Sequence, residues 1–187
     1  MVLAGACLSA CQKESLVPSG SSQGNQTKSS TTTVLNQDTV SNDTTRGYLR
    51  VQLAEDAVNT DNVLIEFSPD SKSTYVSNED ARTFQGFGQV SLSSLSSDNV
   101  LLAINSLPLS TKGTSVKLAV SAKSKGTFKL NLSTIHGIPN KFDIWLKDKF
   151  KKDSTNFRQN PSYAFTISSD TTTYGSNRFS VVLHTHK

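Results

Sequence analysis

Apolar and polar residues alternate along most of the chain after residue 46, and this period of two predicts β-strands. In residues 48–54, for example, Leu49, Val51 and Leu53 fall on one face of the predicted strand. The pattern predicts nine short strands, over residues 48–54, 63–67, 88–95, 99–105, 114–121, 126–133, 141–148, 162–168 and 178–184. No convincing helical period interrupts them, so residues 47–187 are expected to form one all-β domain.

One apolar face per strand is typical of antiparallel sheets that pack on a shared core. The fold expected from this pattern is an antiparallel two-sheet β-sandwich of about nine strands. A barrel is the alternative, because it also buries one face of every strand. Ser124, Lys125 and Gly126 lie between two predicted strands and form a hairpin turn signal.

The segment before the domain, residues 12–46, shows neither a strand period nor a helix period. Ser, Thr, Asn, Gln and Gly dominate it, and apolar residues are few. Such a segment cannot bury enough surface to offset the entropy lost on ordering, so a disordered Ser/Thr-rich tether is expected. A flexible chain of this length spans about 30 Å on average, which is enough to lift a domain off a membrane surface.

The first eleven residues, MVLAGACLSAC, are small and apolar and are too short to cross a bilayer. Residues 8–11 (LSAC) resemble a bacterial lipobox, in which the cysteine is lipidated and becomes the mature N-terminus. The resemblance implies that residues 1–11 are part of a lipoprotein signal peptide whose basic start lies upstream of Met1. It makes Cys11 the lipid attachment site. Residues 12–15 (QKES) resemble the short charged signal that exports lipoproteins of Bacteroidetes-type bacteria to the cell surface.

Charge and cysteine content narrow the function classes. The 19 Lys and Arg against 15 Asp and Glu give a net charge of +4, without a basic helix or a dense Arg cluster, so no nucleic-acid partner is expected. The two cysteines, Cys7 and Cys11, both precede the predicted domain, which therefore has no internal disulfide. Their spacing lacks the second ligand pair of a zinc site.

Nothing in the sequence predicts an enzyme, a cofactor or a metal. There is no Gly-x-Ser-x-Gly, and the glycine pair in residues 86–88 (GFG) lacks the context of a nucleotide site. Acidic residues flank the predicted strand 63–67, but their spacing matches no calcium loop. His184 and His186 share a strand face near the C-terminal end, where exposed polar residues are the simpler interpretation.

The C-terminal half carries a series of strand and turn motifs. They are INSLP (104–108), GTFKL (126–130), FDIWLKD (142–148), NPSYAFT (160–166) and NRF (177–179). This series resembles a β-sandwich module of large cell-surface and secreted proteins of Bacteroidetes, many of them taken to be adhesins. The match spans roughly residues 48–186, and it implies a sandwich fold and a location on the cell surface.

Two long loops are the candidate recognition surfaces, because loops at the ends of a sandwich commonly carry binding residues. Residues 68–87 contain Tyr75, Phe84 and Phe87, and residues 149–161 contain Phe157 and Arg158. These five are the predicted ligand-binding residues. The alternative is that the aromatic rings only cover the ends of the core.

Two further features of the strands are expected to be structural. Asp148 ends one predicted strand and Arg178 begins another, so we expect an ion pair that closes the loop between them, at the surface and worth about 0–1 kcal/mol. Trp145 lies on the face of its strand opposite the apolar face formed by Ile144 and Leu146. It either packs into a core on that second face or forms an exposed platform for stacking.

These observations predict a non-catalytic, lipid-anchored binding or adhesion module on the outer membrane, exposed at the cell surface. Its partners would be the membrane, through the anchor, and a glycan or an extracellular host protein. The alternative is a structural spacer or assembly component of the cell envelope, a remnant of a larger surface protein. Attachment to the periplasmic face of the outer membrane would differ only in sidedness.

Overall fold

The computed structural model describes residues 46–84 and 86–186. Within them lie one short 3₁₀ helix, η1 (Thr171–Thr173), and the strands β1 (Gly47–Ala54), β2 (Thr60–Phe67), β3 (Ala81–Arg82), β4 (Val90–Leu95), β5 (Leu101–Leu107), β6 (Thr114–Ala122), β7 (Gly126–His136), β8 (Phe142–Asp148), β9 (Asp153–Asn156), β10 (Ser162–Ile167) and β11 (Gly175–Thr185). The prediction of an all-β domain is confirmed, and each of the predicted strands is present. The two short strands β3 and β9 are additional.

The strands form one continuous hydrogen-bonded ladder, in the order β10-β7-β1-β2-β5-β4-β6-β11-β8-β9, with β3 added beside β5. The prediction of two separate, purely antiparallel sheets was therefore too simple. β2 and β5 pair in parallel, which joins the two halves of the ladder. A parallel pair needs a long crossover, and the chain between β2 and β5 supplies it with β3 and β4.

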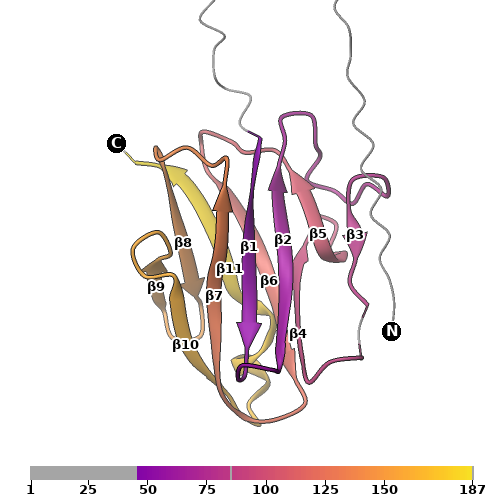
Figure 1. The fold of residues 1–187 in the computed structure, drawn as a ribbon, viewed down its shortest axis with the longest axis vertical. Helices are drawn as coiled ribbons and strands as arrows, with labels where there is room; N and C mark the ends of the chain where they lie inside the picture. The colour runs from indigo at the N-terminus through magenta and orange to yellow at the C-terminus, as the bar shows by residue number, and fades with distance from the viewer. Residues whose placement is uncertain (1–45, 85, 187) are drawn as a thin grey trace, which may run out of the picture. The chain divides into compact units, whose positions relative to one another are not determined.

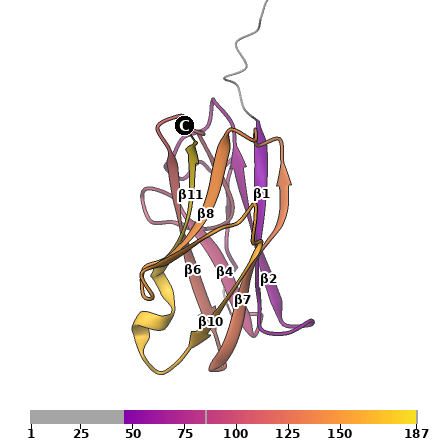
Figure 2. The same cartoon turned by 90° about the vertical axis from the view of Figure 1, so that its left-hand side faces the viewer.

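The ladder curls so that its two halves face each other (Figures 1 and 2). β1, β2 and β7 form one wall, and β6, β8 and β11 form the opposite wall. The result is a nearly closed, barrel-like sheet whose ends are β9 and β10. At this seam the phenol of Tyr163 on β10 donates to Asp153 Oδ2 on β9 at 3.3 Å, so side chains bridge the gap between the two end strands.

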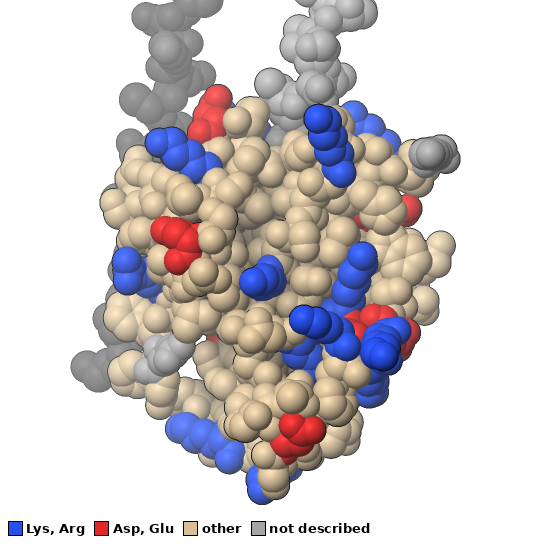
Figure 3. Space-filling view, turned by 180° about the vertical axis from the view of Figure 1, so that it is seen from behind, with Lys and Arg blue, Asp and Glu red and all other residues tan. Residues whose placement is uncertain are grey.

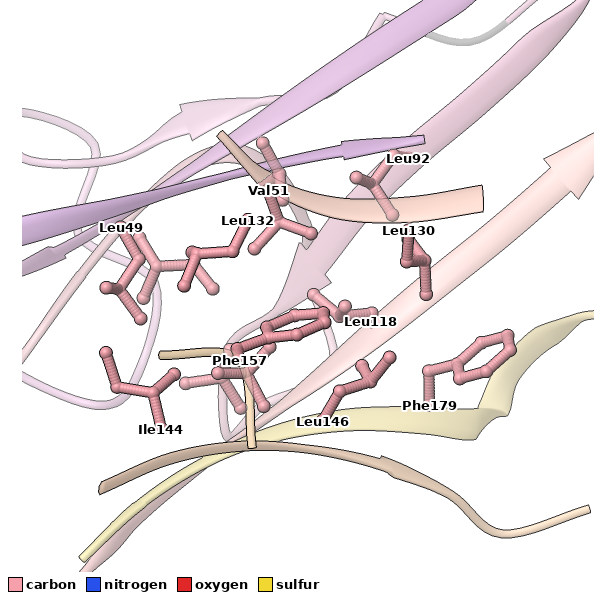
Figure 4. Close-up of a cluster of buried hydrophobic side chains, with 14 of the residues drawn as sticks. Leu49, Val51, Leu92, Leu118, Leu130, Leu132, Ile144, Leu146, Phe157 and Phe179 are labelled. Carbon is pink, nitrogen blue, oxygen red and sulfur yellow. The ribbon is translucent and has the colours of Figure 1, made fainter. Parts of the chain in front are cut away.

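The core fills the space between the two walls with the alternating residues that the sequence pattern singled out (Figure 4). On β1, Leu49, Val51 and Leu53 are fully buried, as the period of two predicts. Phenylalanine supplies the bulk of the packing: the six that are almost completely buried are Phe67, Phe128, Phe142, Phe157, Phe165 and Phe179. Each buries a large apolar area and stabilises the closed sheet by about 1.5–3 kcal/mol relative to exposure.

A buried polar network lies beneath the seam. Arg178 on β11 contacts Asp148 at the end of β8 with Nη2 2.8 Å from Oδ2, and the two side chains are 1% and 0% exposed. Arg178 Nη1 donates to the carbonyl oxygens of Thr166 on β10 and Thr173 of η1. The expected ion pair is thus present, but it is buried, because the curl of the sheet places the start of β11 and the end of β8 under β10. It fastens the edge of β10 that no neighbouring strand pairs.

The same network fixes the ionisation of its members. Burial by itself would raise the pKa of Asp148. Hydrogen bonds from Arg178 and from the backbone N–H of Lys151, with the positive charge of Arg178, outweigh burial and hold that pKa below its ordinary value. The phenol of Tyr163 also donates to Asp148, at 3.2 Å, and burial next to this negative charge raises the pKa of Tyr163.

The domain has two distinct ends (Figure 1). β1 begins at one of them, where Gly47 pairs with Phe67. The opposite end, called the distal end below, carries the β1–β2 turn (55–59), the β6–β7 turn (123–125) and the loop that leads into β4.

Candidate functional site

A groove of about 560 Å³ opens beside the distal end, on the outer face of β4 and β6. The loop before β4 forms one side of it, with Gly86, Gly88 and Gln89. Tyr174 and Ser176, at the start of β11, form the other side. The groove therefore joins three segments that are far apart in the sequence.

The floor of the groove consists of small side chains, and the strand register explains why. Ser91 on β4 pairs with Ser121 on β6, and Ser93 pairs with Ala119. These residues alternate with the core residues Val90, Leu92, Leu118 and Val120, so they lie on the other face of the strands, where Ser93 is buried at the floor of the groove. Because none of the four outward side chains is larger than serine, this face is hollow where longer side chains would fill it.

A bulge in β11 deepens the groove. Gly175 pairs with Val120 and Phe179 pairs with Leu118, so four steps along β11 correspond to two along β6. The extra residues carry β11 away from the sheet at this point. Gly175 has φ of +86°, a backbone conformation that favours glycine, and it begins the detour. The same bulge turns Arg178 inward to Asp148, so the groove and the buried ion pair share one structural cause.

Two exposed phenylalanines lie in the loop that lines the groove: Phe84 precedes its glycines, and Phe87 lies between Gly86 and Gly88. Phe84 and Phe87 are each 89% exposed, among the largest exposures of any apolar side chain in the described residues. Isolated surface apolar residues are common, but two rings this exposed beside a hollow mark a surface suited to binding. Both residues lie in the segment between β3 and β4, in one of the two loops for which the sequence predicts recognition.

Tyr75, the third predicted residue of this loop, lies apart from the groove. Its backbone N–H donates to Asp98 Oδ1 at 3.0 Å, and the guanidinium carbon of Arg82 lies 4.5 Å from the centre of its ring. The half-buried ring therefore supports β3, the short strand that carries Arg82. In this position it orders the loop that continues to Phe84.

The two predicted residues of the second loop have structural positions, which corrects the expectation that they face a ligand. Phe157 is 1% exposed, and its ring packs among core residues that include Leu118 and Leu146 (Figure 4). The backbone N–H of Phe157 donates to the carbonyl of Ile144 on β8, which draws the residue under the sheet. The ring is thus part of the core, as the alternative interpretation held.

Arg158 holds a neighbouring turn together. Its Nε donates to the carbonyl of Phe142 at 2.8 Å, and its Nη2 donates to the carbonyls of Ile138 and Pro139 at 3.1 and 3.0 Å. A guanidinium whose donors are engaged with backbone oxygens has little left for a ligand. The structure therefore separates Phe157 and Arg158 from Phe84 and Phe87.

The acidic residues flanking β2 stabilise turns and strand ends. Four of the carboxylates considered for calcium accept hydrogen bonds or ion pairs from within the domain: Asp56 from Val58 and Asn59, Asp61 from Leu92, Asp70 from Arg46, and Asp80 from Val76 and Ser106. Hydrogen bonds from the backbone of Asn59 and Val58 lower the pKa of Asp56. Within residues 46–84 and 86–186, no three His, Cys, Asp or Glu side chains gather as metal ligands would.

Sequence reasoning found Phe84 and Phe87 but missed the groove beside them. The signal was present in part: alternation in residues 90–95 and 114–122 places Ser91, Ser93, Ala119 and Ser121 outward. Only the pairing of β4 with β6 shows that these small residues adjoin.

Trp145 lies half-buried on the outer face of β8, and its indole nitrogen is buried without a hydrogen-bond partner among the described residues.

Comparison with known proteins adds no assignment: no family model matches the chain, and neither a curated protein nor a solved structure does. In the described part of the chain, no helix has the length and apolar character needed to span a membrane. Cys11, the predicted signal peptide (1–11) and the predicted tether (12–46) lie outside the described residues, apart from Arg46.

Proposed function

We propose that this protein is a non-catalytic, lipid-anchored binding module of the cell surface, and that the groove beside Phe84 and Phe87 binds an extracellular glycan. The observation that supports it most directly is the exposure of both rings, 89% each, in the loop whose residues Gly86, Gly88 and Gln89 line a groove floored by small side chains. The distal position of the rim, away from the end where β1 begins, suits a ligand that approaches from outside.

The groove combines apolar and polar lining atoms, and a sugar has matching groups of both kinds. Sugar rings have apolar faces that stack on aromatic rings and hydroxyl groups that exchange hydrogen bonds with hydroxyl and amide side chains. The groove offers the hydroxyls of Ser91, Ser121 and Ser176 and the amide of Gln89. Gln89 and Ser121 are exposed, and Ser91 and Ser176 are half-buried, so their polar groups are available at the surface of the groove.

The anchor is the second part of the proposal, and the sequence pattern at residues 8–11 supports it. A Cys11→Ser variant should lose membrane association and incorporation of a fatty-acid label in the native host, while Cys7→Ser should retain both. Proteolysis of intact cells tests sidedness: cleavage of the protein under conditions that spare periplasmic proteins supports surface display. Protection from the protease would place the domain on the periplasmic face instead.

Glycan binding is tested by applying the full chain to an array of neutral and acidic glycans and measuring saturable binding to any hit by calorimetry. The Phe84→Ala/Phe87→Ala double variant should weaken binding at least about tenfold, because stacking on aromatic rings supplies about 1–3 kcal/mol. Ser121→Trp, which fills the floor, should also block it. Val58→Ala is the matched control, since Val58 is 87% exposed at the same end of the domain but does not line the groove.

Two outcomes would contradict this function. Binding that survives both groove variants would place the ligand elsewhere on the domain. A folded protein that captures no glycan would leave the groove without a role, and would favour the alternative of a structural spacer in the cell envelope.

A further inference from the structure

Lysine and serine side chains form a row on the outer face of β6, β11, β8 and β9, which points away from the core. Ser180 on β11 pairs with Lys117 on β6 and with Lys147 on β8, and Lys147 pairs with Ser154 on β9. Lys117, Ser180, Lys147 and Ser154 thus stand side by side across four strands; we call them the lysine row. Lys117 and Lys147 are two strands apart, about 10 Å from the usual strand spacing.

Two further lysines extend this row at the β8–β9 turn. Lys149 and Lys152 join Lys147, Ser154 and Ser180 around a hollow of about 500 Å³. The view from behind shows Lys and Arg side chains gathered over this part of the domain (Figure 3). This part of the domain therefore carries a local group of lysines, although the net charge of the chain is only +4.

The turn that presents these lysines is built by the buried ion pair. Asp148 Oδ1 accepts the backbone N–H groups of Phe150 and Lys151 at 3.0 and 3.1 Å. Lys152 has φ of +53°, a left-handed conformation that this tight turn imposes. Because Arg178 holds Asp148 in place, the backbone of the turn that carries the lysines is also held in place.

Little negative charge opposes the lysines. Asp148 is neutralised by Arg178 inside the domain, which leaves Asp153 as the carboxylate that faces the hollow. Asp153 Oδ2 accepts from the phenol of Tyr163, and Asp153 Oδ1 accepts the backbone N–H of Ser154. Against it stand the four lysines at positions 117, 147, 149 and 152, all of them exposed.

We propose that this face binds an acidic polysaccharide, with the chain crossing the strands along the lysine row. Its sulfate or carboxylate groups would pair with the ammonium groups, and its hydroxyls would bond to Ser180 and Ser154. The outer side chains of the neighbouring strand positions are Val182 and Trp145, which pair across β11 and β8 and supply an apolar strip for the sugar rings. This surface shares no lining residue with the groove, although both extend over the outer face of β6, where Lys117 and Ala119 are neighbouring positions on the same strand face.

The arrangement favours a polysaccharide over the two other polyanions a basic face can meet. A bilayer is flat and favours an apolar tip that can insert. Phe150, at the turn, is 47% exposed, but its ring lies 5.1 Å from the guanidinium carbon of Arg178, and the lysines beside it surround a hollow. Lysine and arginine both pair with nucleic-acid phosphates, but specific contacts to base edges are most often made by the arginine fork. The arginine of this region, Arg178, is buried and engaged with Asp148 and two carbonyls.

The test uses the full chain and five probes. Dextran sulfate and polygalacturonate are the acidic chains, uncharged dextran is the neutral control, and duplex DNA and phosphatidylserine vesicles are the competing polyanions. The variant is Lys117→Gln/Lys147→Gln. The matched control is Lys72→Gln/Lys129→Gln, which removes the same charge from exposed lysines outside this face. We expect the variant to bind the acidic chains at least about tenfold more weakly at low salt, and its log K against log[salt] slope to be smaller by about two.

Three results would overturn the proposal. An equal loss in the matched control would mean diffuse attraction by net charge. Tighter binding of DNA or vesicles than of either acidic polysaccharide would identify another class of partner. Binding of uncharged dextran as tight as that of the acidic chains would mean that charge does not drive binding. The Phe84→Ala/Phe87→Ala variant should bind dextran sulfate as the unmodified protein does, so this test and that of the distal groove succeed or fail separately.

Discussion

Arg178 Nη2 lies 2.8 Å from Asp148 Oδ2 in the interior of the domain, where neither side chain has meaningful contact with solvent. This one pair connects three features. It fastens β10 through the carbonyl of Thr166, it stands at the bulge that opens the distal groove, and it holds the β8–β9 turn that presents the lysine row. An exposed ion pair of the same geometry would contribute little to the stability of the domain.

Removing one partner of this pair should destabilise the domain strongly. Asp148→Ala leaves a buried guanidinium without its counter-charge, and we expect a loss of about 3–5 kcal/mol in the free energy of unfolding. Urea denaturation followed by circular dichroism measures it. The matched control is Asp70→Ala, which breaks the Arg46–Asp70 pair, whose side chains are 67% and 81% exposed. That variant should lose less than about 1 kcal/mol, and similar losses in both would contradict the assigned role of the buried pair.

The pair should also make stability depend on acid pH. The pKa of Asp148 is lowered in the folded state, so the unfolded chain binds the extra proton as pH falls. Stability from this group is therefore fully present above the unfolded value, about 3.9, and is lost as pH falls through the folded pKa. We expect the stability difference between the unmodified protein and Asp148→Asn to stay constant from pH 7 to 5 and to shrink below about pH 4. A difference that grew on acidification would contradict this assignment.

Substitution by alanine should lower the stability of the domain strongly at Phe157 and hardly at all at Phe84. Phe157→Ala opens a cavity in the core and is expected to cost about 3–5 kcal/mol, whereas Phe84→Ala removes a solvated ring and should change stability by less than about 0.5 kcal/mol. Thermal and urea denaturation of the two variants checks this. If Phe157→Ala were as harmless as Phe84→Ala, the ring would not be part of the core.

Arg158 should act through its hydrogen bonds to the carbonyls of Phe142, Ile138 and Pro139. Arg158→Lys keeps the charge but cannot reach several carbonyls with one ammonium group, so it should destabilise the domain by about 1–3 kcal/mol, nearly as much as Arg158→Ala. Denaturation curves of both variants measure this. Full rescue by lysine would mean that charge alone matters there, and would reopen a ligand-binding role for this residue.

Much of the fold could be predicted because the alternation of side chains is a local property of a strand. Leu49, Val51 and Leu53 are buried wherever β1 is placed, since the backbone sends successive side chains to opposite faces. β3 and β9 escaped prediction because they are too short to show a period. Phe157 escaped because a lone phenylalanine after a polar strand carries no pattern that separates core from loop.

By itself, the sequence determined the all-β class, the positions of the nine longer strands and the loop that holds Phe84 and Phe87. The tertiary structure alone decided that the strands join in one curled ladder, that Asp148 and Arg178 meet in the interior, and that Lys117 and Lys147 flank Ser180. The reason is physical. Alternation depends on the geometry of each strand, whereas neighbours across strands depend on pairing and register between segments far apart in the chain.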